Sequence, residues 1–177
     1  MISIKRATEE DYKSIVTIGK ISVAEAHRDS TSEENLNEYL EKNYNEDAII
    51  QELNDLNNIY HIISYDGLQV GFSKINLNAK HPDIVAENIT KLDRIYLLKE
   101  FYGLKLDLEL LKFNIKYARN NNQSGIWLYT WIGNNRAVNF YLKTRFKIIG
   151  SHKFYVTEKF YNLNHHMFLN LLETGSA

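Results

Sequence analysis

The spacing of apolar residues predicts an α/β protein that begins with a short strand. Ile2 and Ile4 alternate with polar neighbours, as in a strand that is buried on one face. Thr8 is followed by three acidic residues, which is typical of a helix N-terminus. The first third of the chain therefore predicts a strand, a helix that starts near Thr8, a second helix from Ser32 and a third from Asp47 to Leu56.

A β-hairpin is expected next, because two runs rich in Ile, Tyr and Phe flank a turn dipeptide. The runs are Ile59 to Tyr65 and Leu68 to Leu77, and Asp66-Gly67 between them is a strong hairpin signal. The polar stretch from Asn78 to Lys91 is expected to be a long loop. The apolar run from Leu92 to Leu98 behind it predicts a central strand.

A long helix is expected after that strand, because apolar residues recur there at helical spacing. They form two stripes, so we expect the helix to be buried on two sides; the stripes are Leu104, Leu108, Leu111, Ile115 and Ala118, and Leu106, Leu110, Phe113 and Tyr117. The remaining apolar runs predict a strand, a shorter helix and two final strands, at Ile126–Trp131, Asn134–Thr144, Phe146–Val156 and Leu163–Leu171.

This order of elements predicts an α/β (α+β) fold with a mixed, mostly antiparallel central sheet of six to seven strands flanked by helices. A parallel pair is expected where the long helix connects the strand Leu92–Leu98 to the strand Ile126–Trp131. Ligands of such sheets bind beyond the carboxyl ends of the strands, where a helix N-terminus offers unpaired amides. We therefore expect the functional site at this crossover.

Composition narrows the class of protein further. The 177 residues are 44% hydrophobic and carry a formal net charge of -1, which predicts a single domain over residues 1–177 with no general attraction to nucleic acid or anionic membranes. The absence of cysteine excludes disulfides and a cysteine nucleophile. No apolar run is long enough to span a membrane or to act as a signal sequence, so the sequence predicts a cytoplasmic protein.

Histidines and aromatic residues are candidate binding groups in this sequence. The histidines lack a carboxylate or cysteine partner at ligand spacing, so no metal site is predicted; they are His27, His61, His81 and His165-His166. Trp127, Tyr129 and Trp131 alternate along one strand and predict core packing or a dimer contact. Stacking on nucleic acid would need a basic surround, which the sequence around them lacks.

Two segments of the second half resemble motifs of the GNAT superfamily of N-acetyltransferases. The segment Leu92 to Gly103 is similar to the strand and turn that hold acetyl-CoA in that family. The segment Asn134 to Phe146 is similar to the signature N-x-x-A-x-x-F-Y-x-x-x-G-F, with matches at Asn134, Ala137, Phe140, Tyr141 and Phe146. Tyr39-Leu40, Tyr44 and Gly150 to Tyr155 extend the resemblance to bacterial spermidine/spermine N-acetyltransferases of the PaiA type, over essentially the whole chain.

The resemblance implies a GNAT-like fold and acetyl-CoA as cosubstrate. In the family, pantetheine pairs with strand amides, here those of Ile95, Tyr96, Leu97 and Leu98. The pyrophosphate rests on the backbone of the following turn and helix start, here Tyr102, Gly103, Leu104, Lys105, Leu106, Asp107 and Leu108. Further cofactor contacts are implied for Asn134, Ala137 and Lys143.

The phosphate turn departs from the family pattern Q/R-x-x-G-x-G/A. Tyr102, Lys105 and Asp107 stand at its three defining positions, and Arg145 replaces the glycine before the last Phe of the second motif. Glycine is favoured there because the backbone approaches phosphate closely and takes positive φ, which lysine and aspartate tolerate less well. Asp107 also adds a negative charge near the phosphates, and Lys105 adds a compensating positive one.

The resemblance gives each candidate catalytic residue a role, and each residue also has an ordinary structural interpretation. Tyr141 is at the position of the general acid that protonates the leaving thiolate, or is a core aromatic that packs on Ala137. Asp93, or a water held by it, accepts the proton of the amine, or is an exposed carboxylate paired with Lys91 or Arg94. The amide of Leu97 is a candidate donor to the oxyanion.

Two of the implied cofactor contacts have equally ordinary alternatives. Asn134 either binds the cofactor or caps a helix, and Lys143 either binds the cofactor or is solvated. The sequence leaves both interpretations open for each residue.

The acceptor predicted by the resemblance is a small-molecule primary amine, a polyamine such as spermidine or spermine, acetylated by direct transfer. Four acids either attract a polycation or form a solvated helix face: Glu33, Glu34, Glu38 and Glu41. Two alternatives stay open: a weak or inactive acyl-CoA-binding regulatory module, suggested by Lys105 and Asp107, and a protein N-acetyltransferase. The aromatic final strands would suit a homodimer.

Overall fold

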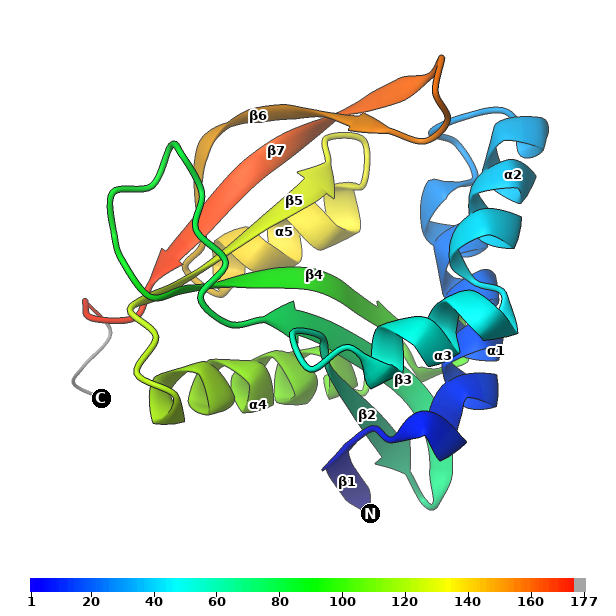
Figure 1. Cartoon of the computed structure of the whole chain (residues 1–177), viewed down its shortest axis with the longest axis horizontal. Coiled ribbons are helices and arrows are strands. Elements are labelled where there is room, and N and C mark those ends of the chain that lie inside the picture. Colours follow the sequence, from blue (N-terminus) through cyan, green and yellow to red (C-terminus); the bar gives the residue numbers. More distant parts are fainter. Residues whose placement is uncertain (174–177) are drawn as a thin grey trace. The chain divides into compact units, whose positions relative to one another are not determined.

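Seven strands form one mixed sheet in the computed structural model, which describes residues 1–173 (Figure 1). The strand order is β1-β2-β3-β4-β5-β7-β6, and five α-helices flank the sheet. The strands are β1 (Ile2–Arg6), β2 (Ile59–Tyr65), β3 (Leu68–Asn76), β4 (Ile89–Leu97), β5 (Gly125–Trp131), β6 (Lys147–Tyr155) and β7 (Tyr161–Asn170). The helices are α1 (Tyr12–His27), α2 (Glu33–Asn43), α3 (Glu46–Asn54), α4 (Leu106–Asn120) and α5 (Asn135–Lys143), with 3-10 turns η1 (Glu9–Asp11) and η2 (Lys99–Phe101).

The pairing of the strands confirms the predicted mixed, mostly antiparallel sheet. β1 with β2, β2 with β3, β5 with β7, and β6 with β7 are antiparallel pairs. β4 and β5 are parallel, with Ile89 opposite Gly125 and Lys91 opposite Trp127, and α4 makes the connection between them. This crossover is the one expected from the sequence, because a parallel pair cannot be joined by a tight turn.

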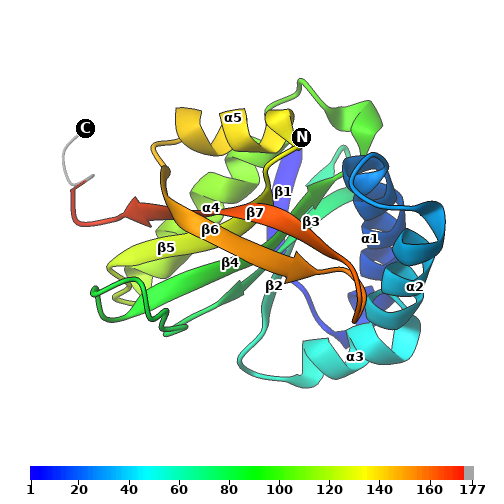
Figure 2. The ribbon, with the colours of Figure 1, turned by 90° about the horizontal axis from the view of Figure 1, so that it is seen from above.

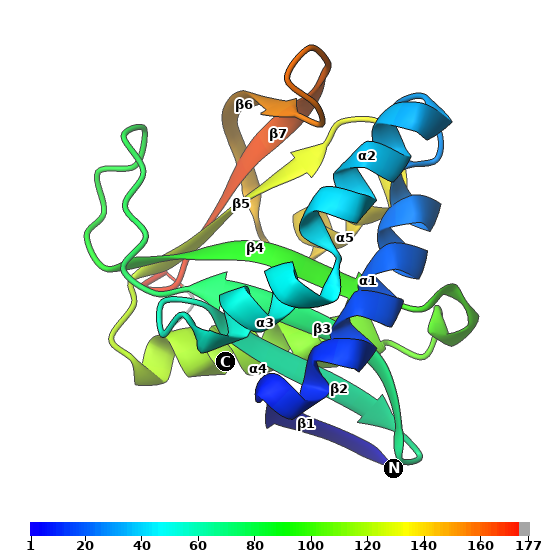
Figure 3. The same cartoon turned by 45° about the vertical axis from the view of Figure 1, so that its right-hand side comes forward.

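The chain divides into two compact units. The first comprises residues 1–75 and 94–114, and the second comprises residues 76–93 and the described chain from residue 115. In the first unit, α1, α2 and α3 cover one face of β2 and β3 (Figure 3); Ile15, Ile49, Tyr60, Ile62 and Phe72 belong to this core. The start of α4 covers the opposite face, where Ile63, Val70, Leu97, Leu106 and Leu110 pack together.

The second unit is built around the strands β5, β7 and β6. Figure 2 shows α5 lying along one side of these strands. β6 forms the edge and is exposed along most of its length, whereas β7 alternates between buried and exposed positions. This alternation is the pattern of a strand with one buried face.

Local signals for the first helices and the hairpin are confirmed. Thr8 forms a capping box at η1, and Ser32 accepts a hydrogen bond from the Asn35 amide at the start of α2. Asp66 and Gly67 have φ values of 48° and 84°, as a two-residue hairpin turn requires.

Several predicted boundaries are wrong: α3 ends at Asn54 rather than Leu56, and β7 begins at Tyr161 rather than Leu163. β4 begins at Ile89, inside the expected loop, because Ile89 and Thr90 are fully buried and pair with β5. Here pairing partners outweigh the polar composition of the stretch. α4 begins at Leu106 rather than Leu104, and Leu104 is 46% exposed. Within residues 1–173, no helix has the length and hydropathy needed to span a membrane.

Candidate functional site

One edge of β4 leaves its backbone groups available to a ligand. The Leu98 amide donates to the Val70 carbonyl of β3 at 2.9 Å. Because backbone groups alternate along a strand, the amides of Leu97 and Ile95 point to the edge turned away from β3. β3 approaches closely here, since a Cβ on Gly71 would lie 2.6 Å from the Tyr96 carbonyl oxygen.

The turn after β4 has the backbone shape that glycine normally supplies. η2 is followed by Gly103 with φ 86° and Lys105 with φ 60°, and α4 begins at the next residue. Lys105 therefore occupies the left-handed region at the position where the family has glycine, at a cost of about 1–2 kcal/mol for an L-residue. Lysine tolerates this conformation less well than glycine, yet the turn has this conformation at Lys105.

Asp107 lies inside the first turn of α4, where positive φ is not needed. Its carboxylate Oδ1 accepts a hydrogen bond from the Leu108 amide at 2.9 Å. The first intrahelical bond at this end runs from the Glu109 amide to the Lys105 carbonyl at 3.1 Å. Backbone amides of the first turn of a helix point out of its N-terminal end. This end of α4 presents amide donors and the positive end of the helix dipole.

Tyr141 is held by the end of α5. The Phe146 amide donates to the Tyr141 carbonyl at 3.0 Å and the Arg145 amide donates to the Leu142 carbonyl at 3.1 Å, which is a Schellman motif. Arg145 has φ 73°, so the second glycine position of the family also keeps its left-handed backbone. The Tyr141 ring packs on Phe146 at 5.4 Å and on Phe140 at 5.3 Å, and the residue is only 7% exposed.

Asp93 forms an ion pair with Lys91, one of the two partners expected from the sequence. Its Oδ1 lies 2.7 Å from the Lys91 ammonium, and its side chain is 21% exposed. Arg94 instead binds Glu52 through two nitrogens at 3.0 and 3.2 Å and lies over the Tyr44 ring at 4.9 Å. The carboxylate is therefore next to a cation and partly accessible.

The remaining predicted contacts lie on α5. The Asn134 side chain accepts a hydrogen bond from the Ala137 amide at 3.1 Å, so its capping role is present. Lys143 is exposed in the last turn of the helix. The first unit thus brings together the β4 edge and the turn, and the second unit brings together Asn134, Ala137, Tyr141 and Lys143.

Sequence reasoning missed two clusters. In the first unit, Glu52 binds Arg94 and also pairs with Lys74 at 2.9 Å and accepts from Tyr60. Arg94 and Lys74 lower the pKa of Glu52 against the effect of burial, which raises it. No local sequence pattern predicts this cluster, because its members come from α3, β2, β3 and β4.

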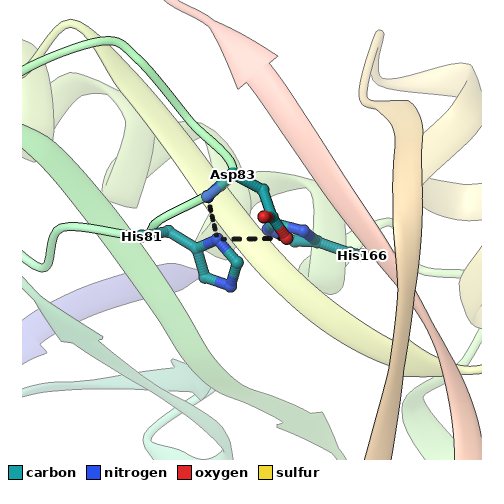
Figure 4. A group of neighbouring side chains, drawn as sticks. All are labelled: His81, Asp83 and His166. Carbon is teal, nitrogen blue, oxygen red and sulfur yellow. Dashed lines mark hydrogen bonds and ion pairs between the residues drawn. The ribbon is translucent and has the colours of Figure 1, made fainter.

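In the second unit, His81, Asp83 and His166 place ligand atoms within 4.8 Å of one another (Figure 4). The absence of a carboxylate partner, on which the prediction of no metal rested, does not hold. The spacing His81-x-Asp83 was visible in the sequence, whereas the third residue is distant along the chain.

The chain belongs to the acetyltransferase (GNAT) family. A sequence model of that family matches residues 20–146, which include the β4 edge, the turn and the whole second motif. The protein is therefore an N-acetyltransferase of the GNAT type, an acyltransferase that uses acetyl-CoA as cosubstrate.

Relatives support the family at the level of sequence and of fold. An uncharacterized N-acetyltransferase encoded in the pepI 3' region of Lactobacillus delbrueckii subsp. lactis is 27% identical over 153 residues, which cover 86% of this chain and 88% of the relative. The crystal structure of the PaiA N-acetyltransferase of Thermoplasma acidophilum in complex with coenzyme A superposes with a TM-score of 0.79 at 21% identity, over 96% of this chain and 99% of that one. The ribosomal-protein-S18-alanine N-acetyltransferase of Escherichia coli superposes with a TM-score of 0.70 at 14% identity, over 97% and 94%.

Proposed function

We propose that this N-acetyltransferase transfers the acetyl group of acetyl-CoA directly to a primary amine of a polyamine. The observation that carries the proposal is the left-handed backbone of Lys105 at the start of α4. It supports a working phosphate turn, and so an enzyme, over an inactive module. The similarity to a PaiA N-acetyltransferase with bound coenzyme A agrees with this interpretation. The cytoplasmic location and the homodimer stay predictions from the sequence.

The proposed cofactor contacts follow the two features of the first unit. Pantetheine amides would pair with the backbone at Ile95 and Leu97, whose amides face away from β3. The pyrophosphate would rest on the turn from Tyr102 to Leu108, where amide donors and the helix dipole favour a negative charge. Lys105 adds a positive charge in compensation for Asp107.

The proposed reaction needs a nucleophile, an acid and a base. The neutral amine nitrogen attacks the thioester carbonyl carbon, a C–N bond forms, and the C–S bond breaks. Tyr141 donates its phenolic proton to the departing thiolate, and Asp93 or a water held by it accepts the proton lost by the amine. The Leu97 amide is the proposed donor to the oxyanion.

The polyamine acceptor is proposed from the charge on α2. Its carboxylates Glu33, Glu34, Glu38 and Glu41 are all exposed, and Glu41 lies 3.4 Å from Lys20. A polycation gains from several neighbouring carboxylates at once, whereas a monoamine does not. This difference makes the acceptor class testable.

The test begins with calorimetric titration of acetyl-CoA into the protein and continues with release of CoA on addition of an amine panel. The panel contains spermidine, spermine, a simple monoamine and a peptide with an N-terminal alanine. We expect binding, turnover, and the highest kcat/KM with the polyamines. Binding without turnover by any amine would indicate the regulatory module, and preference for the peptide would indicate a protein N-acetyltransferase.

A pair of charge variants sharpens the acceptor test. Glu34→Gln combined with Glu38→Gln should raise the KM for spermidine several-fold and leave the KM for the monoamine unchanged. The matched control is Glu10→Gln combined with Glu87→Gln, two exposed acids on other elements. Equal effects of both double variants on spermidine would contradict a polyamine site on α2.

A further inference from the structure

The loop between β3 and β4 brings His81 and Asp83 next to His166 on β7, and all three side chains can ligate a metal ion. Figure 4 shows the side chains of His81, Asp83 and His166 converging. His81 Nδ1 lies 3.8 Å from Asp83 Oδ2, and each of the three residues offers a ligand atom within 4.8 Å of the others. The imidazole rings of His81 and His166 have centroids 4.1 Å apart.

The tautomer of His81 is fixed by two hydrogen bonds. The Asp83 amide donates to His81 Nδ1 at 3.2 Å, so Nδ1 carries no proton. His81 Nε2 therefore carries the proton and donates to the Tyr129 hydroxyl at 2.6 Å. Tyr129 is itself stacked on the His152 ring at 3.9 Å. A metal ion at His81 Nδ1 would replace the hydrogen bond from the Asp83 amide, while Tyr129 holds the distal nitrogen, as second residues usually do for histidine ligands.

His166 is a buried group without a hydrogen-bond partner at one nitrogen. Its residue is 1% exposed, and its Nε2 has no partner among residues 1–173. Leaving a buried polar atom unsatisfied is costly, so such an atom needs an explanation. A metal ion bound at His166 Nε2 would satisfy this atom.

We propose that His81, Asp83 and His166 bind a divalent transition-metal ion, of which Zn²⁺ is the best match. Two imidazoles and a carboxylate are a common ligand set for such an ion, and three protein ligands leave one position for water. Tetrahedral ligands at Zn²⁺ distances are separated by about 3.3–3.5 Å, so His81 and Asp83 need to close by only a few tenths of an ångström. The side chain of Asp83 is 72% exposed, which gives the ion a path from solvent.

The proposed ion would tie the loop to the strands of the second unit. The loop is already held by the Ala79 carbonyl, which accepts from Trp127 Nε1 at 2.7 Å, and by Asn78, which binds Gln123 at 2.9 Å. Both contacts hold the start of the loop, one to β5 and one to the turn before β5. The ion would add a contact to β7, and we expect it to stabilise the fold.

The test uses the full-length protein without an affinity tag, freed of metal by a chelator. Zn²⁺ is titrated by calorimetry, and Co²⁺ is titrated with the visible d–d bands that report a low-coordinate site. We expect one equivalent of each ion to bind, and the melting temperature to rise with Zn²⁺. Asp83→Asn and His81→Asn should weaken binding at least tenfold, and Tyr129→Phe should weaken it about 10–100-fold by releasing the His81 tautomer.

Two matched controls keep the result specific. His165→Asn removes the neighbouring histidine, which points to the other face of β7, and Glu87→Gln removes an exposed acid of the same loop. Both should bind Zn²⁺ like the unaltered protein. No binding by the unaltered protein, or equal loss in His165→Asn and His81→Asn, would overturn the proposal. Asp83 is exposed, so its variant reports on the site even if His81→Asn loses structure.

Discussion

Tyr141 and Phe146 are joined twice, by a backbone hydrogen bond of 3.0 Å and by ring packing at 5.4 Å. Both contacts depend on the left-handed φ of 73° at Arg145 between them. Because glycine adopts that conformation without strain, Arg145→Gly should raise the free energy of unfolding by about 0.5–1 kcal/mol after the entropy of glycine in the unfolded chain is deducted. Urea denaturation measures the change.

The matched control for that substitution is Lys143→Gly, two residues earlier in the last turn of α5. Lysine there is helical and exposed, so glycine should lower stability by about 0.5–1 kcal/mol. Destabilisation by both variants would show that the backbone of Arg145 is unstrained.

Lys105 combines two effects that a pair of variants separates. Lys105→Ala keeps an L-residue at φ 60° and removes the side chain beyond Cβ together with its charge, so the Kd for acetyl-CoA should rise a few-fold at low salt and less at high salt. Lys105→Gly also relieves the backbone, and should be more stable than Lys105→Ala by about 1 kcal/mol. Calorimetry at two salt concentrations and urea denaturation test both statements, and equal stability of the two variants would contradict the strain at this position.

Tyr141→Phe should separate chemistry from binding. Loss of the proposed acid should lower kcat by about 10²–10⁴-fold, with the Kd for acetyl-CoA nearly unchanged, because the ring still packs on Phe146. Tyr155→Phe, on an exposed tyrosine of β6, is the control and should keep full activity. A kcat unchanged by Tyr141→Phe would assign the residue to the core alone.

His27 should make stability depend on pH below neutrality. Burial lowers the pKa of His27 to about 4 in the folded state, from an ordinary value of 6.5. The unfolded chain therefore binds the proton first as the pH falls, and stability should decrease between pH 6.5 and 4, by an amount on the order of 1–3 kcal/mol. The full stability should be present above pH 6.5, and His27 should cause no further loss of stability below pH 4.

Urea denaturation at several pH values between 4.5 and 7.5 measures this effect with little interference from carboxylates. His27→Gln should make the free energy of unfolding fall less steeply as the pH decreases. Part of the fall should remain, because the pKa values of buried His61 and His166 are also lowered. An unchanged slope in His27→Gln would contradict a lowered pKa at the partly buried His27.

The sequence predicted most of the elements because their signals are local. The Asp66-Gly67 turn, the capping residues Thr8 and Ser32, and the two apolar stripes of α4 each act within a few residues. The start of β4 was misplaced because Ile89 and Thr90 owe their strand conformation to pairing with β5, which is distant along the chain. The motif positions were also visible, including the substitutions at Lys105 and Arg145.

The sequence alone identifies the class of protein, a GNAT-type acetyltransferase. It also gives the residue numbers of the strand, the turn and the second motif. Tertiary structure decided how the unusual residues are used. It placed Lys105 and Arg145 in the left-handed backbone of the glycines they replace, paired Arg94 with Glu52, and brought His166 to His81 and Asp83. These relationships depend on φ values and on contacts between strands far apart in the chain, and residue types alone encode neither.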